Sequence, residues 1–293
     1  MIRLKMVLGL NDMTDIKDLT AIQIETLNYC NARCTFCPLS VQMREKGYMD
    51  DVTFAKIIQE CKTAPNLKFI LPYLNSEPFM DKTFFERFDY VIKELPHIKY
   101  VIFTNGGLIN DDIITELEKR SAHIEKITVS ISYCDEDSYE KHVGLNWKIL
   151  NIILSKLKNS PIKEKISLKI LQSEGNNLHT VKAFIDKFSK EFSIVISRYL
   201  DWSGKTHDKL ALQPSKKKIC DRVKTDLVIY WDGRVSLCCI DNEGDVILGD
   251  INNDTLNDIY NSTIHEKYIK LMYNNEKHKL PLCKECNMVG GDE

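Results

Sequence analysis

Three cysteines lie close together near the start of the chain, in the pattern C-x₃-C-x₂-C formed by Cys30, Cys34 and Cys37. Thiolates are soft ligands that suit iron–sulfur clusters. Three thiolates leave one iron of a four-iron cluster open, so that the amino and carboxylate groups of a bound molecule can chelate it. Zinc is the alternative, but zinc takes a fourth ligand and none lies nearby in the sequence. The spacing therefore predicts a [4Fe–4S] cluster.

A second group of cysteines falls in the last quarter of the chain. Cys220 is followed after twelve residues by Gly233 and after four more by Cys238, and Cys283 and Cys286 form a later C-x₂-C pair. Four thiolates suit either structural zinc or a fully ligated iron–sulfur cluster. The spacing alone leaves both open.

Cys239 is a surplus thiol next to one of these ligands. A hairpin is expected around Asp232 and Gly233, with Cys238 on its second strand. Side chains alternate along a strand, so Cys239 should point away from Cys238 and serve as a small core residue. The alternative is a hydrogen-atom donor that quenches a substrate radical.

The elements that must position these cysteines alternate along the chain. Strands are expected at 21–26, 67–73, 100–104, 127–131, 166–171 and 193–199, and helices at 51–63, 82–95, 111–120, 146–157 and 178–188. This order predicts an α/β fold with a parallel sheet and right-handed crossovers, either a partial (β/α)₆ barrel or an open doubly wound sheet. The strands at 227–231 and 235–238 and helices within 254–273 come later. We expect a barrel over residues 1–205 and a small cluster domain over 206–293.

Bulk composition narrows the class of protein. The chain has 293 residues, 43% of them hydrophobic, and a formal net charge of −2 from 40 basic and 42 acidic residues. No general attraction to nucleic acid is implied, and the Lys216–Lys218 run is expected to be a solvated face. No apolar run reaches membrane-spanning length and no signal peptide is evident. We expect a cytoplasmic protein with no membrane or nucleic-acid partner.

The C-x₃-C-x-aromatic-C pattern resembles the radical S-adenosylmethionine (SAM) superfamily. The resemblance implies a partial (β/α)₆ barrel, SAM bound at the open iron, a 5'-deoxyadenosyl radical that abstracts hydrogen, and a one-electron reductant such as flavodoxin or ferredoxin. Further motifs match in order at the ends of successive strands, although Asn75 and Ser76 replace the glycines of a Gly-Gly-Glu type motif. The implied SAM-binding residues are Phe36, Asn75, Ser76, Glu77, Thr104, Asn105 and Ser130.

The C-x₁₂-G-x₄-C arrangement resembles the SPASM/twitch extension of the same superfamily. The chain stops seven residues after Cys286, which favours the shorter twitch form with one auxiliary [4Fe–4S] cluster. That resemblance makes Cys220, Cys238, Cys283 and Cys286 its ligands. A fully ligated cluster cannot chelate substrate, so electron transfer is its expected role.

The expected substrate is a small molecule, because only about 29 residues precede Cys30, too few for a leader-peptide-binding domain. The segments 37–40, 47–50 and 282–287 are similar to a branch of twitch enzymes that dehydrogenate a cyclitol. Dehydrogenation of a sugar or cyclitol hydroxyl is thus the leading hypothesis. The candidate bases are Arg198, Lys205 and His207, and the segment 198–204 resembles a family stretch that lines the SAM and substrate space. The alternatives are a redox-neutral epimerase that uses Cys239, a peptide-modifying enzyme, and a zinc-stabilised binding scaffold.

Overall fold

The computed structural model describes residues 15–172, 176–200, 202 and 219–288, and it contains the alternating elements that the sequence predicts. The strands are β1 (Ala21–Ile24), β2 (Phe69–Leu71), β3 (Lys99–Thr104), β4 (Ile124–Ser132), β5 (Ile166–Gln172), β6 (Ser193–Arg198), β7 (Asp226–Ile229), β8 (Arg234–Ser236) and β9 (Ile247–Asp250).

The helices lie between and after these strands. They are α2 (Asp51–Cys61), α3 (Phe84–Glu94), α4 (Asp111–Lys119), α5 (Glu136–Val143), α6 (Trp147–Lys158), α7 (Leu178–Phe188), α8 (Arg222–Thr225), α9 (Leu256–Tyr260), α10 (Thr263–Tyr273) and α11 (Pro281–Lys284). Short 3₁₀ turns occur at Ile16–Asp18, Pro38–Ser40, Pro78–Met80, Ser121–His123, Pro161–Lys165 and Lys277–Lys279.

Local sequence explains where the long helices begin. The side chains of Asp50, Asn110, Asn146 and Asn177 each accept a hydrogen bond from the backbone N–H three residues later, which caps the first turn of α2, α4, α6 and α7. Each helix then buries an apolar stripe. These helices therefore start where a short polar side chain precedes an apolar periodic segment.

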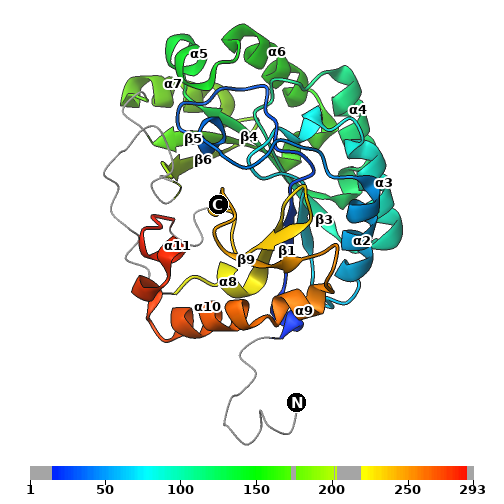
Figure 1. Cartoon of the computed structure of the whole chain (residues 1–293). Helices are drawn as coiled ribbons and strands as arrows, with labels where there is room; N and C mark the ends of the chain where they lie inside the picture. The colour runs from blue at the N-terminus through cyan, green and yellow to red at the C-terminus, as the bar shows by residue number, and fades with distance from the viewer. Residues whose placement is uncertain (1–14, 173–175, 201, 203–218, 289–293) are drawn as a thin grey trace, which may run out of the picture.

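Strands β1 to β6 form a parallel sheet in the order β6-β5-β4-β3-β2-β1, which agrees with the predicted barrel connectivity. Burial alternates along β3, where Tyr100, Ile102 and Thr104 are buried, whereas β1, β4 and β5 contain runs of buried residues. Figure 1 shows α2, α3, α4, α6 and α7 in an arc outside the curved sheet. The curved sheet and its outer helices form the partial (β/α)₆ barrel, and the open doubly wound sheet is excluded.

The C-terminal strands continue this sheet. Strand β7 pairs in parallel with β1, with Ile22 opposite Leu227, and β8 and β9 follow as antiparallel neighbours. In the described part of the chain the result is one nine-stranded sheet that ends at β9. The domain boundary near residue 205 stays a prediction, since hydrogen-bonded strands join the two parts.

The predicted hairpin is present, but its second strand is shorter than expected. Gly233 makes the turn with a φ of +92°, a conformation that side chains other than glycine rarely adopt. Strand β8 ends at Ser236, so Cys238 and Cys239 lie in the loop that follows it. The prediction that Cys238 sits on a strand is wrong, and strand alternation therefore does not place Cys239.

None of the helices in the described ranges is long and apolar enough to cross a membrane. The largest fully buried side chains include Tyr100, Tyr139, Tyr260 and Phe88 of the main core, and Tyr230, which packs in a smaller cluster with Leu74 and Val228. This core holds the ends of the barrel strands in fixed positions around one cavity.

Candidate functional site

A cavity of about 270 Å³ opens inside the curve of the sheet, and side chains from or just after all six barrel strands line it. The residues predicted to bind SAM all face this cavity, namely Phe36, Asn75, Ser76, Glu77, Thr104, Asn105 and Ser130. Cys30, Cys34 and Cys37 line the same cavity. The structure thus brings together predicted residues that span a hundred positions in the sequence.

The loop carrying the three N-terminal cysteines leaves β1 and is fastened to the end of α5. The Arg33 and Thr35 amides donate to the carbonyls of Val143 and His142 at 2.9 Å each, and the Cys37 amide donates to the Cys34 carbonyl at 3.1 Å. All three thiols are partly exposed to the cavity. The donor set and its access fit a [4Fe–4S] cluster with one open iron.

The surroundings of these thiols are poorly solvated. Burial raises the pKa of Cys30 to about 11 and raises the pKa of Cys34 and Cys37 as well. The Cys30 sulfur accepts hydrogen bonds from the Ala32 amide at 3.4 Å and Asn105 Nδ2 at 3.5 Å. A metal that displaces the proton is therefore what makes these groups thiolates at neutral pH.

Glu77 is fully buried and ties the ends of two strands together. Its Oε1 accepts from Thr104 Oγ1 at 2.6 Å and its Oε2 accepts from the Asn105 amide at 2.8 Å. Burial raises the pKa of Glu77 to about 7, although these hydrogen bonds oppose the shift. The carboxylate thus holds the loop after β2 against the loop after β3.

The other predicted SAM-site residues form the rest of this wall. Asn75 is buried and its Nδ2 donates to Asn242 Oδ1 at 2.7 Å, which explains why a side chain is accommodated at this position. Phe36 packs against Tyr133 and Tyr199, with ring centroids 6.1 and 6.2 Å apart. An aromatic surface of this kind suits a nucleobase.

The C-terminal cysteines influence one another. A hydrogen bond with the Cys239 thiol, followed by burial, raises the pKa of Cys238, and the charge of Cys220 adds to it. Burial raises the pKa of Cys283 to about 12, with further contributions from Cys286 and Cys220. Thiols from segments far apart in the sequence therefore gather in one region.

Cys239 does not point away from Cys238. The two thiols are hydrogen-bonded, both line the cavity, and Arg222 Nη1 lies 3.5 Å from the Cys239 sulfur. The prediction that Cys239 points away from Cys238 is wrong, because the turn after β8 lets consecutive side chains face the same space, although Cys239 does pack against the core. In the described ranges no three Cys, His, Asp or Glu side chains converge on a point for a single metal ion. A four-iron cluster holds its thiolates farther apart.

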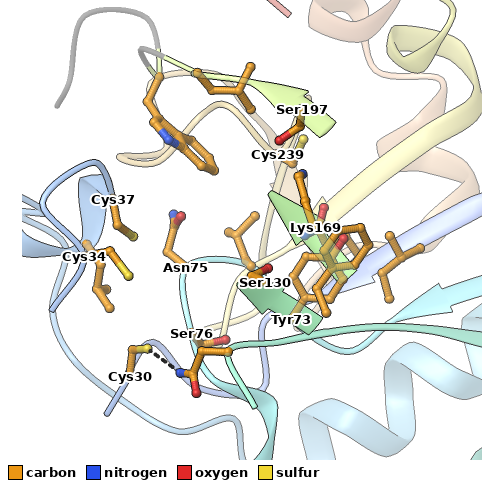
Figure 2. A pocket seen from close by; sticks show the side chains of 18 of the residues that line it. Cys30, Cys34, Cys37, Tyr73, Asn75, Ser76, Ser130, Lys169, Ser197 and Cys239 are labelled. Carbon is orange, nitrogen blue, oxygen red and sulfur yellow. Dashed lines mark hydrogen bonds between the residues drawn. The ribbon is translucent and has the colours of Figure 1, made fainter. Parts of the chain in front are cut away.

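Figure 2 shows the two ends of the cavity: Cys30, Cys34 and Cys37 lie on one side, and Cys239 lies across the space beside Ser197. Lys169, Tyr73 and Ser130 are grouped in the interior. One cavity therefore reaches from the three-cysteine loop to the cysteines of the C-terminal part.

Of the three candidate bases predicted from the sequence, the structure describes one. Arg198 lines the cavity at the end of β6, and Trp202 from the predicted substrate-lining stretch does so as well. Lys205 and His207 lie outside the described residues.

Sequence reasoning missed Lys169, Tyr73 and Arg222, which also line the cavity. Lys169 projects from β5, and its Nζ lies 5.3 Å from the centroid of the Phe103 ring. A lysine inside an apolar strand, on the face opposite the buried Leu168 and Ile170, was the available signal.

Comparison with known proteins identifies the class. The sequence model of the radical SAM superfamily matches residues 24–188, and that of the SPASM iron–sulfur cluster-binding domain matches residues 220–287. The chain belongs to the radical SAM superfamily and carries a SPASM domain. SAM and a [4Fe–4S] cluster are therefore its cofactors, together with auxiliary iron–sulfur binding, and it acts on a substrate with a reductant.

Particular relatives share this architecture. S-adenosyl-L-methionine-dependent 2-deoxy-scyllo-inosamine dehydrogenase of Niallia circulans is 22% identical over 275 residues, which cover 92% of each chain. The crystal structure of BtrN in complex with AdoMet and 2-DOIA has a TM-score of 0.71 at 20% identity, covering 92% of this chain and 94% of that one. Native anSMEcpe with bound AdoMet has a TM-score of 0.69 at 16% identity, covering 92% and 89%. At this identity the structural matches show a shared fold.

Proposed function

We propose that this radical SAM enzyme dehydrogenates a hydroxyl-bearing carbon of a small polar metabolite such as a sugar or cyclitol. The observation that carries the proposal is the single cavity lined by Cys30, Cys34 and Cys37 and also by Cys238. A substrate in this cavity lies between the two cysteine groups. The similarity to a cyclitol dehydrogenase supports the same reaction class.

The two groups of cysteines are the proposed ligands of two iron–sulfur clusters. Cys30, Cys34 and Cys37 would hold the SAM-binding cluster, and Cys220, Cys238, Cys283 and Cys286 would hold one auxiliary cluster. When bound, SAM and these clusters supply a radical that takes a hydrogen atom from carbon and an acceptor for the remaining electron. Flavodoxin or ferredoxin is the proposed reductant.

The protein's own residues must bind the substrate and move a proton. Oxidation of a carbinol to a ketone removes one hydrogen atom from carbon, one proton from oxygen and one electron. Arg198 and Arg222 can donate hydrogen bonds to hydroxyl groups, but an arginine does not readily accept a proton. An ammonium also has no free lone pair, but lysine loses its proton far more readily than arginine does. Lys169 Nζ, which the barrel interior presents to the cavity, is therefore the better candidate to take the hydroxyl proton, and it does so as the neutral amine.

Apolar side chains form part of the cavity wall. Phe36, Phe103, Leu171 and Trp202 contribute apolar surface next to the polar groups. An apolar lining with a few convergent polar groups is typical of small-molecule sites. Such a site favours a compact polar ring over a long polymer.

A second candidate reaction is redox-neutral epimerisation with Cys239 as the hydrogen donor. The specific observation in its favour is that Cys239 lines the cavity. A thiol S–H bond is weak enough to give its hydrogen to a carbon radical, whereas a serine O–H bond is not. In this reaction the substrate keeps its oxidation level and the thiol is oxidised.

Turnover in D₂O distinguishes these two reactions. Anaerobically reconstituted enzyme is incubated with SAM, dithionite and a panel of sugars and cyclitols, and 5'-deoxyadenosine and products are followed by mass spectrometry and NMR. Dehydrogenation gives a ketone two mass units lighter, whereas epimerisation gives a product with deuterium on carbon. Deoxyadenosine formation with peptides and with none of the small molecules would contradict the proposed substrate class.

Lys169→Met tests the proposed proton acceptor. We expect ketone formation to fall by about 10²-fold or more while uncoupled deoxyadenosine formation continues. Arg198→Met at the cavity rim is the matched control and should have a smaller effect on ketone formation. Equal losses in both variants would contradict the assignment to Lys169.

A further inference from the structure

Asn242 connects the C-terminal cysteine loop to the barrel. It is fully buried and lies four residues after Cys238. Its Oδ1 accepts hydrogen bonds from Asn75 Nδ2 at 2.7 Å and from Gln42 Nε2 at 3.1 Å. Its backbone carbonyl accepts from Arg44 Nε at 2.8 Å. One residue of the C-terminal part therefore contacts two different barrel loops.

The loop that presents Asn242 is held firmly by its neighbours. The carboxylate of buried Asp241 accepts from Ser236 Oγ and from the Val246 amide at 2.8 Å each. Arg44 makes a two-point ion pair with Glu25 at 2.8 and 2.9 Å, with both side chains buried. These contacts fix Asn242 Oδ1 as a stationary acceptor.

Asn75 stands at the other end of this contact. Its side chain is only 3% exposed, and it immediately precedes Ser76 and Glu77 on the loop after β2. On the far side of that loop Glu77 is bound to Thr104 and Asn105. The loop is thus held at both ends, by the strand β3 terminus and by Asn242.

We propose that Asn242 is a positioning residue for SAM binding, acting through Asn75 to hold the loop of Asn75, Ser76 and Glu77 in its binding conformation. This inference rests on the proposed role of that loop in binding SAM. Removing the acceptor leaves Asn75 Nδ2 buried without this partner and gives the loop more conformations. SAM must then order the loop on binding, so its affinity falls.

The test measures SAM binding without turnover. Equilibrium dialysis with radiolabelled SAM and no reductant gives the Kd for the reconstituted wild type, Asn242→Ala, Asn75→Ala and the double variant. We expect each single change to weaken binding about fivefold, in line with one net hydrogen bond. The double variant should bind about as weakly as each single variant, because both changes remove the same contact.

Asn252→Ala is the matched control. Asn252 also bridges the barrel and the C-terminal part, accepting from Thr53 Oγ1 at 3.0 Å, but it is exposed and does not line the cavity. Iron content and thermal unfolding are measured for every variant, and SAM binding is expected to be unchanged in this one. An equal loss in Asn252→Ala would indicate general loosening and overturn the inference.

Glu77→Ala separates the inference from the proposed site. If Glu77→Ala weakens SAM binding while both asparagine variants bind normally, the positioning role of Asn242 is wrong and the site assignment stands. If none of these changes affects binding, the loop is not the SAM site. Multiplicative losses in the double variant would show that the two asparagines act independently, which also overturns the inference. Should Asn242→Ala fail to fold, Asn242→Leu, which keeps the side-chain shape and removes the acceptor, takes its place in the same comparison.

Discussion

The two cysteine groups of this enzyme are built in different ways. Cys30, Cys34 and Cys37 lie on one loop, which backbone hydrogen bonds to Val143 and His142 fasten to the barrel. The C-terminal group combines residues from the segment before α8, the loop after β8 and the region of α11. The first site is local in sequence, whereas the second exists only when three separate segments fold together.

This difference has consequences for stability and for assembly. A local loop can present its thiols as soon as the barrel forms, because few chain segments must be brought together. The C-terminal site depends on the pairing of β7 with β1 and on the turn at Gly233. We therefore expect the C-terminal group to be the more sensitive of the two to changes outside its own ligands.

The largest expected effect comes from removing the N-terminal group. The triple change of Cys30, Cys34 and Cys37 to alanine should reduce 5'-deoxyadenosine formation to background, since no other residues would hold the SAM-binding cluster. Iron per chain should fall from about eight to about four. Deoxyadenosine assays and iron and sulfide analysis measure both quantities. Deoxyadenosine produced at the wild-type rate would show that the site is assigned wrongly.

The next effect concerns the adjacent thiols of the C-terminal group. Cys238→Ser should lose the auxiliary cluster, leaving about four irons per chain, while deoxyadenosine formation stays within about tenfold of wild type. Cys239→Ser is the matched control and should keep about eight irons. Because the two thiols are hydrogen-bonded and line the same cavity, either could be the ligand, and reversed iron contents would assign that role to Cys239.

Sequence reasoning predicted the barrel well because its signals are local. Strands β1 to β6 have period-two or continuous apolar character, and each of β1 to β5 is followed by a helix. Helix α5 was missed, since Glu136–Val143 is short and mostly polar and its start depends on the Asp135 side chain capping the Ser138 amide. Strand β9 was missed because four residues that contain a glycine give little signal.

In the cavity, too, residues with a local sequence signal were predicted and residues without one were not. The predicted SAM-site residues are strand-end motifs, and all of them line the cavity. Cys239 was misplaced because the prediction extended β8 two residues too far, and side chains alternate in direction only within a strand. The contact between Asn75 and Asn242 joins residues 167 positions apart and leaves no pattern in the sequence.

Glu77→Gln tests the loop beside the N-terminal cysteine group through the pH dependence of the free energy of unfolding. Burial raises the pKa of Glu77 to about 7, above the ordinary value of 4.5, so the folded state favours the neutral acid. The stability from neutral Glu77 is fully present below about pH 4.5 and is lost as pH rises through about 7. Glutamine stays neutral throughout.

The free energy of unfolding of the wild-type apoprotein should therefore fall relative to Glu77→Gln by about 3 kcal/mol between about pH 4 and pH 8. Urea denaturation at a series of pH values measures this difference. Aspartate variants are unsuitable controls because they shorten the side chain, so Glu125→Gln at an exposed position serves instead. A pH-independent difference between wild type and Glu77→Gln would mean that the carboxyl is solvated.

Gly233→Ala tests whether the C-terminal site depends on its turn. Gly233 has a φ of +92°, and a Cβ added there would clash with Asn252 Nδ2. The backbone conformation alone should cost about 1–2 kcal/mol in unfolding free energy for an alanine. The steric contact adds to this cost until the Asn252 side chain moves.

The same change should weaken cluster retention. Because β8 leads from this turn to Cys238, the auxiliary cluster should also be lost more readily during dialysis, whereas deoxyadenosine formation should be little changed. The double variant Gly233→Ala, Asn252→Ala removes the steric contact and keeps the backbone strain, so it should recover only part of the stability. Urea denaturation and iron retention after dialysis measure the two effects, and an alanine variant with wild-type values of both would show that the C-terminal site tolerates distant changes as well as the N-terminal one does.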